Sequence, residues 1–146
     1  MTKTNELYDL AEDRGYAVYD CRFDTGLKGV SVPLTGGGCA IGLNRANSQA
    51  EEREVLAHEL GHCETWAFYE GDGTALQRGK LEARADRWAI EHLTPPEELR
   101  RALDEGCREP WELAERFGVT EEFIRRAWDH YTNICGMQLN EEEAGC

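Results

Sequence analysis

Apolar positions in the first 44 residues show one helical pattern followed by strand-like runs. Leucine and alanine recur at helical spacing within residues 6–13, and Gly15 should end that helix because glycine readily adopts the left-handed conformation of a C-cap. Three runs that are rich in β-forming residues or alternate apolar and polar positions follow, at residues 16–19, 30–34 and 39–43. They predict a small sheet over about 16–44, with Pro33 on an edge strand because proline has no N–H to donate.

From residue 48 onward the apolar spacing becomes helical. Ser48 and Glu51 have the spacing of a capping box, in which both side chains accept hydrogen bonds from backbone N–H groups at the start of a helix. One face of the helix that they open is apolar, at Leu56, Leu60, Cys63 and Ala67. This stripe predicts that the helix packs against the protein core.

Further capping signals divide the rest of the chain into helices. Residues 74–77 form a second capping box, Thr-x-x-Gln, which opens a helix that runs to about residue 93. Residues 94–97 form a third, and Pro95 should occupy the first helical position, where a missing N–H is tolerated. Two shorter helices are predicted at about 111–117 and 120–131.

These patterns predict the α+β class, with a small early sheet packed on a mostly helical body. A length of 146 residues suits one domain with its own core. We expect that domain over 1–134, with the sheet at about 16–44, central helices at about 48–93 and further helices at about 95–131. Residues 135–146, which include three consecutive glutamates, should form an acidic tail.

The charge balance narrows the classes of partner. The chain has 29 acidic and 16 basic side chains, for a formal net charge of −13. Binding to a phosphate backbone needs a basic surface, so nucleic acid is not the expected direct partner. No apolar run approaches the roughly 20 residues that span a bilayer. The N-terminus also lacks the apolar segment of a secretory signal, so we expect a cytoplasmic protein without membrane contact.

The six cysteines are scattered and none forms a C-x-x-C pair; they are Cys21, Cys39, Cys63, Cys107, Cys135 and Cys146. A zinc ribbon or a redox dithiol would need such a pair. A disulfide framework needs an oxidising compartment, and no export signal is evident. We therefore expect free, reduced thiols that pack as small apolar side chains.

The capped helix contains the sequence His58-Glu-Leu-Gly-His62. Histidines four residues apart project from one face of a helix, so both imidazoles can reach one metal ion. Glu59 lies about 100° around the helix from His58, which places its carboxylate beside the metal. There it can take a proton from a bound water whose pKa zinc lowers to about 7. Zinc is the expected ion, because imidazole and carboxylate are its usual catalytic ligands.

The competing interpretation of this motif is two surface histidines on an amphipathic helix. Two features of the context favour the metal site. The motif lies inside a capped helix, and the histidines border the apolar stripe instead of lying opposite it.

The next predicted helix offers a third ligand. Glu82 and Asp86 lie one turn apart on one face, and the glycines at 71–73 allow this helix to return antiparallel to the first. We expect Glu82 to ligate the metal and Asp86 to accept the second N–H of a ligand histidine, with Asp86 as ligand the lesser alternative. A solvated carboxylate pair interleaved with Arg84 and Arg87 is the competing interpretation.

The remaining histidines, His92 and His130, are expected to be packed or to cap a helix end. Peptide hydrolysis also needs a second group that stabilises the oxyanion. Tyr69, His92 and Arg45 are all candidates, and the sequence does not choose between them.

Most of the chain, to about Trp128, resembles the ImmA/IrrE family of metallopeptidases. The pieces that carry this resemblance are residues 39–44, the His58–His62 motif, Glu82-Ala-Arg-Ala-Asp-Arg-Trp-Ala89, the exit Leu93-Thr-Pro95 and the later segment 113–120. The second of the two metal-site helices is the discriminating element, because H-E-x-x-H occurs in many unrelated metalloproteases.

The resemblance implies a zincin-like fold and a gluzincin-like zinc metalloendopeptidase with one catalytic Zn²⁺. By that resemblance His58 and His62 correspond to zinc ligands. Glu59 corresponds to the catalytic glutamate, and Glu82 to the third ligand. Family members often belong to prophages and conjugative elements, where they cleave or inactivate a helix-turn-helix repressor. The implied partner is therefore a DNA-binding repressor.

Two other functions compete with proteolysis. A metal-binding regulatory module could inactivate or sequester a repressor without cleaving it, and a fourth ligand such as Cys63 or His92 would support that function by closing the site. The second competing function is that of a DNA-binding regulator, which is suggested by the resemblance of residues 113–120 to half of a helix-turn-helix. The following helix begins with two glutamates and offers only Arg125 and Arg126 as a basic pair, which disfavours DNA contact. The oligomeric state cannot be inferred from the sequence.

Overall fold

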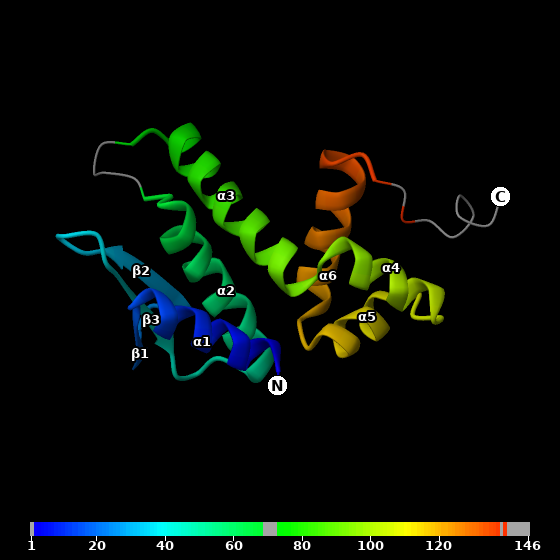
Figure 1. Ribbon diagram of the computed structural model, residues 1–146, viewed down its shortest axis with the longest axis horizontal. Helices are drawn as coiled ribbons and strands as arrows, with labels where there is room; N and C mark the ends of the chain where they lie inside the picture. Colours follow the sequence, from blue (N-terminus) through cyan, green and yellow to red (C-terminus); the bar gives the residue numbers. More distant parts are fainter. Residues whose placement is uncertain (1, 69–72, 138, 140–146) are drawn as a thin grey trace. The chain divides into compact units, whose positions relative to one another are not determined.

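The computed structural model describes residues 2–68, 73–137 and 139. The chain divides into two compact units, Met1–Ala89 and Ile90–Cys146. The boundary falls within helix α3 (Ala75–Leu93), which contributes residues to both units. Helices and a small sheet together make up the fold (Figure 1), so the α+β prediction is confirmed. The prediction of one domain over 1–134 stays a prediction.

The first unit contains a three-stranded mixed sheet. Its strands are β1 (Ala17–Cys21), β2 (Gly29–Pro33) and β3 (Cys39–Asn44), in the order β1-β3-β2. Strand β3 pairs parallel with β1 and antiparallel with β2. Pro33 therefore lies on an edge strand, as the sequence predicts.

Strand β3 is the buried centre of this sheet. Its alternate residues Cys39, Ile41 and Leu43 are at most 2% exposed, as expected for a strand that turns one face to a core. Helix α1 (Lys3–Arg14) precedes the sheet and ends at Gly15, whose φ of 76° is the left-handed conformation expected there.

Helix α2 (Gln49–Thr65) packs on the sheet and against α1. The predicted capping box is present: the Ser48 hydroxyl accepts from the Glu51 amide at 3.1 Å, and the Glu51 carboxylate accepts from the Ser48 amide at 2.9 Å. The predicted apolar stripe is buried at Leu56, Leu60, Cys63 and Ala67, although Ala67 lies just beyond the helix end.

Helix α3 runs beside α2 in the same unit (Figure 1). The second predicted capping box opens it, with the Thr74 amide donating to the Gln77 side chain at 3.0 Å and the Gln77 amide donating to the Thr74 hydroxyl at 3.1 Å. Ala85 and Ala89 are buried on this helix, at 0% and 1% exposure. Small side chains at these positions leave room for close packing of the helix.

The second unit is helical in its described residues. Helices α4 (Pro96–Asp104), α5 (Pro110–Phe117) and α6 (Glu121–Asp129) are followed by a short π-helical turn, His130–Ile134. Tyr131 lies in its core at 2% exposure and donates its hydroxyl proton to the Thr94 carbonyl at 2.7 Å.

The third predicted capping box is wrong. The Thr94 side chain is buried and donates to the carbonyl oxygen of Ile90 at 2.7 Å, one turn back in α3. Pro95 is the N-cap of α4, and the first helical position belongs to Pro96. A threonine hydroxyl can bond to the carbonyl four residues earlier as well as to an amide ahead, and here it caps the end of the preceding helix.

The expectation of reduced cysteines is also wrong for one pair. Cys39 on β3 and Cys63 on α2 form a disulfide, with Cα atoms 6.0 Å apart. Strand alternation turns Cys39 inward and the helical stripe turns Cys63 inward, so the two thiols meet in the core. Cys21, Cys107 and Cys135 are free.

Much of the predicted acidic tail lies outside the described residues, which exclude 138 and 140–146. Leu139 is described and is 4% exposed. Within the part of the chain that is described, no helix combines the length and the apolar character needed to cross a membrane.

Candidate metal centre

Three side chains from two helices converge in the first unit. His58 and His62 project from the same face of α2, and Glu82 reaches them from α3. Each offers one ligand atom, and the three atoms lie within 4.8 Å of one another. Of the residues that the structure describes, these three form the group that could hold a metal ion.

The separation of the two histidine nitrogens fits a tetrahedral ion. The two histidine Nε2 atoms are 3.2 Å apart, and the Glu82 carboxylate oxygens lie 3.1 Å from His58 Nε2 and 2.8 Å from His62 Nε2. A tetrahedron with metal–ligand bonds of 2.0–2.1 Å has edges of about 3.3 Å. The two histidine nitrogens have about this separation, whereas the two Glu82 contacts involve different carboxylate oxygens, so one of these oxygens would have to turn toward both nitrogens to ligate a zinc ion.

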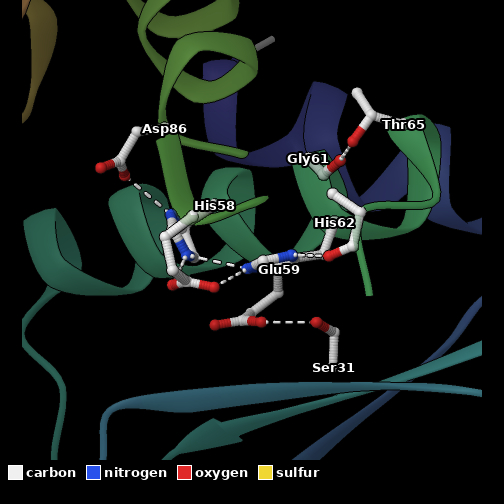
Figure 2. A network of polar contacts seen from close by, with 9 residues as sticks. Ser31, His58, Glu59, Gly61, His62, Thr65 and Asp86 are labelled. Atoms are coloured by element: carbon white, nitrogen blue, oxygen red, sulfur yellow. Dashed lines mark hydrogen bonds and ion pairs between the residues drawn. The ribbon is translucent and has the colours of Figure 1, made fainter. Parts of the chain in front are cut away.

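Each histidine is oriented by a partner on its other ring nitrogen. His58 donates from Nδ1 to the Asp86 carboxylate at 2.8 Å, and His62 donates from Nδ1 to the Ala67 carbonyl at 2.6 Å (Figure 2). In the neutral rings these bonds select the tautomer whose Nε2 can bind a metal. Asp86 therefore lies on the side of the His58 ring that is turned away from His62 and Glu82. The Ala67 carbonyl is a backbone group, and no side-chain pattern in the sequence points to it.

Glu59 lies beside the three donors. It follows His58 on α2, is only 8% exposed, and has its carboxylate on the side of the helix that faces β2 (Figure 2). Ser31 of β2 donates its hydroxyl proton to Glu59 Oε1 at 2.7 Å. Sequence reasoning missed this contact, because only strand pairing and packing of the sheet bring residues 31 and 59 together.

The surrounding charges favour a protonated His58 in the absence of metal. Burial alone would lower the pKa of His58, but the hydrogen bond to Asp86 and the nearby carboxylates outweigh it and raise the pKa to about 9. Burial raises the pKa of Glu59, while the Ser31 hydrogen bond and the neighbouring histidines oppose that rise. A divalent cation would relieve the excess of negative charge here.

A cleft of about 400 Å³ opens beside Glu59. Edge strand β2 lines it with Val30, Ser31 and Pro33, and the metal-site helices contribute Glu59, His62 and Glu82. Phe68, which follows α2, also lines the cleft, and its ring stacks on His62 with centroids 6.0 Å apart. The cleft therefore combines titratable groups with an apolar wall.

The structure brings together all the residues predicted for the site, but neither of the two oxyanion candidates that it describes lines the cleft. Arg45 and His92 are exposed and do not line it, and Tyr69 lies outside the described residues. His130 is packed, as expected, at 6% exposure with its Nε2 3.1 Å from the Glu91 carboxylate.

Comparison with solved structures identifies the same fold in another protein. A Mycobacterium tuberculosis transcriptional regulator superposes with a TM-score of 0.63 at 22% sequence identity. The match covers 83% of this chain but 39% of that protein, so this chain spans well under half of its length. Among curated proteins no match is found.

A comparison with known protein families supports the resemblance that the sequence motifs indicate. Residues 12–129 match the M78 peptidase family through the domain described as IrrE N-terminal-like. The match includes both helices of the metal centre and the whole sheet. This chain belongs to the M78 peptidase family, as an IrrE N-terminal-like domain.

Proposed function

We propose that this protein is a zinc-dependent metallopeptidase that hydrolyses a peptide bond in a protein substrate. The observation that carries the proposal is the convergence of His58, His62 and Glu82, with Glu59 next to them at the cleft. His58, His62 and Glu82 would hold the zinc ion. Asp86 would orient His58 from behind, and Glu59 would act as general base.

Zinc bound here would lower the pKa of a coordinated water and polarise the scissile carbonyl. Glu59 would take the proton from the attacking water, and its location beside the three donors supports this role. It would then deliver that proton to the leaving amine, which must be protonated to depart. The low exposure of Glu59 keeps bulk water from competing for the proton.

Strand β2 supplies a docking edge for the substrate. It pairs with β3 on one side, and no described strand pairs with its other edge, while four of its residues line the cleft. An extended peptide would add to this edge through main-chain hydrogen bonds, which would lay its backbone along the cleft beside Glu59.

We further propose a helix-turn-helix repressor of a phage or conjugative element as the substrate. Membership of the M78 family supports this, as does structural likeness to a protein named a transcriptional regulator. The net charge of −13 is complementary to the basic surface of a DNA-binding protein.

The second candidate is a regulatory module that holds a metal and inactivates a repressor without cleaving it. The name of the structural neighbour favours this alternative. A closed, four-ligand site would support it. Cys63 does not supply that fourth ligand, because its sulfur is bonded to Cys39. Three protein donors are instead the usual number for a catalytic zinc site with one open position.

Replacement of Glu59 by glutamine tests the proposal. Purified wild-type protein, loaded with zinc, is incubated with a repressor encoded by a neighbouring gene, and products are identified by mass spectrometry. We expect cleavage by the wild type, loss of cleavage by at least about 100-fold in Glu59→Gln, and unchanged zinc content. Glu115→Gln, at an exposed position of α5, is the matched control and should cleave normally.

Cleavage by Glu59→Gln at the wild-type rate would contradict the mechanism. If the wild type and Glu59→Gln both prevented the repressor from binding DNA, and neither cleaved it, the result would establish the regulatory module instead.

A further inference from the structure

Ser31 is half-buried and lies on the face of β2 that is turned toward α2, where an apolar residue would be usual. It lies opposite Ile41 of β3 in the antiparallel ladder, so the two side chains share one face of the sheet. Ile41 is fully buried, whereas Val32, the next residue along β2, is 47% exposed. A serine therefore takes a position between the sheet and α2 that a valine would fill in an ordinary core.

Among the residues that the structure describes, the hydrogen-bond partner of the Ser31 hydroxyl is Glu59. The Ser31 hydroxyl donates to Glu59 Oε1 at 2.7 Å and leaves Oε2 available to a second donor (Figure 2). A hydrogen bond to a carboxylate is stronger than one between neutral groups, and here it lies in a partly buried site where water competes poorly.

The backbone of β2 lies close to α2 at Gly29, two residues before Ser31. A Cβ atom built on Gly29 would lie 2.3 Å from Val55 Cγ1 and 3.5 Å from Glu59 Cγ. Only glycine permits this close approach. The approach places a side chain as short as serine within hydrogen-bond distance of the Glu59 carboxylate.

We propose that Ser31 is a positioning residue that holds the Glu59 carboxylate in the orientation for proton transfer. This inference rests on the proposed function, because it assigns Glu59 the role of general base. A glutamate side chain has several rotatable bonds, and fixing one carboxylate oxygen restricts the other to a small region beside the metal donors. Without the bond, repulsion from Glu82 would favour orientations of Glu59 away from the site.

The test compares Ser31→Ala with Ser31→Thr, which retains the hydroxyl, and with Val32→Ala as the matched control. Val32 is the neighbouring residue on β2, is half-exposed and does not line the cleft. For each protein we would measure zinc affinity by competition with a chelator. We would then measure the binding of acetohydroxamate to the zinc-loaded protein.

Acetohydroxamate reports on Glu59 without needing a protein substrate. Its two oxygens can chelate a zinc ion, and its acidic proton can be shared with an adjacent carboxylate. We expect Ser31→Ala to bind zinc within about twofold of wild type but to bind acetohydroxamate about tenfold more weakly, since one charge-assisted hydrogen bond supports the acceptor. Ser31→Thr should recover most of that affinity, and Val32→Ala should match wild type.

Cleavage kinetics provide the second measurement. Loss of orientation at Glu59 should lower kcat about 10- to 100-fold in Ser31→Ala and leave KM unchanged, because the hydrogen bond contributes to the reaction and not to substrate docking. Ser31→Thr should again recover most of the activity.

The outcomes separate this inference from the proposed function. If the wild type cleaves no substrate while the hydroxamate results are as expected, the peptidase proposal fails and the positioning role of Ser31 stands. If the wild type cleaves and Ser31→Ala is normal in both assays, the inference fails alone. Loss of zinc and hydroxamate binding together would show that Ser31 supports the whole site and would also overturn it. Failure of the wild type to bind zinc would overturn both proposals.

Discussion

Gly61 on α2 lies directly against the backbone of Ala85 on α3. A Cβ atom built at position 61 would be 2.7 Å from the Ala85 carbonyl oxygen and 3.1 Å from its Cα. Any side chain here would hold the two helices farther apart, so glycine is required for this contact. Because Ala85 lies between Glu82 and Asp86, the contact sets how closely those carboxylates approach the histidines of α2.

Gly61→Ala should therefore weaken metal binding without unfolding the protein. The added methyl group must push α3 outward, and an outward shift of a few tenths of an ångström would disturb both Glu82, the proposed third ligand, and Asp86, the partner of His58. We expect zinc affinity, measured by competition with a chelator, to fall by about tenfold or more. Circular dichroism should show the same helix content as wild type.

Gly79→Ala is the matched control, because it adds the same methyl group to α3 at a position where no atom lies within 4 Å. It should bind zinc as wild type does and should slightly stabilise the helix, since alanine is the better helix former. Equal zinc affinities for Gly61→Ala and wild type would show that the helix contact does not determine the site.

Local signals in the sequence were sufficient to predict the helices that carry the candidate metal site. The capping box at Ser48 and Glu51 and the spacing of His58 and His62 depend only on residues within one helix, and all of these features are present. The third capping box failed because Thr94 has two possible hydrogen-bond partners, and the buried carbonyl of Ile90 is the one that it meets.

Contacts between distant residues could not be predicted in the same way. Ser31 and Glu59 belong to different elements, and the alternation of β2 alone favours Val32 for the buried face instead of Ser31. The face that turns toward α2 is set by the pairing of β2 with β3, and the close contact of Gly29 with α2 is evident only after the sheet is packed. The pairing of distant cysteines similarly depends on which strand lies beneath α2.

Asp86→Asn should reduce zinc affinity although Asp86 is not a proposed ligand. The carboxylate accepts the His58 Nδ1–H at 2.8 Å, which orients the ring and makes Nε2 a stronger donor to a metal. Loss of the charge should lower zinc affinity about 10- to 100-fold. Asp104→Asn, an exposed position on α4, should have no effect. If Asp86→Asn bound zinc with the affinity of the wild type, Asp86 would have no role in the metal site.

Zinc binding should depend strongly on pH up to about pH 9. In the metal-free protein the pKa of His58 is raised to about 9, so below that pH a proton must leave the imidazole before it can bind zinc. Affinity should rise about tenfold per pH unit from pH 7 to 9 and then level off. Calorimetry in buffers of different ionisation enthalpy should detect the released proton, and a pH-independent affinity would contradict this expectation.

The same ionisation should make the metal-free fold less stable as the pH rises. Because the folded-state pKa of His58 exceeds its ordinary value of 6.5, the charged form stabilises the fold fully below about pH 6.5. That contribution is lost as the pH rises through 9. Urea unfolding of the metal-free protein at pH 6 and pH 9 should show the decrease, and Asp86→Asn should reduce it. Equal stability at both pH values would contradict a stabilising effect of the charged His58.

Reduction of the disulfide between Cys39 and Cys63 should destabilise the first unit. The bond closes a loop over a sequence separation of 24 residues and joins the central strand to the helix that carries the histidines. A cross-link that closes a loop of this size raises the free energy of the unfolded chain by about 3 kcal/mol, because it lowers the conformational entropy of that chain. We expect thiol reductant to lower the thermal unfolding midpoint of the wild type by on the order of 10 °C.

Cys21→Ser, which removes a free thiol from the same sheet, should respond to reductant as the wild type does. An unchanged midpoint after complete reduction, verified by thiol titration, would show that the bond contributes nothing to stability.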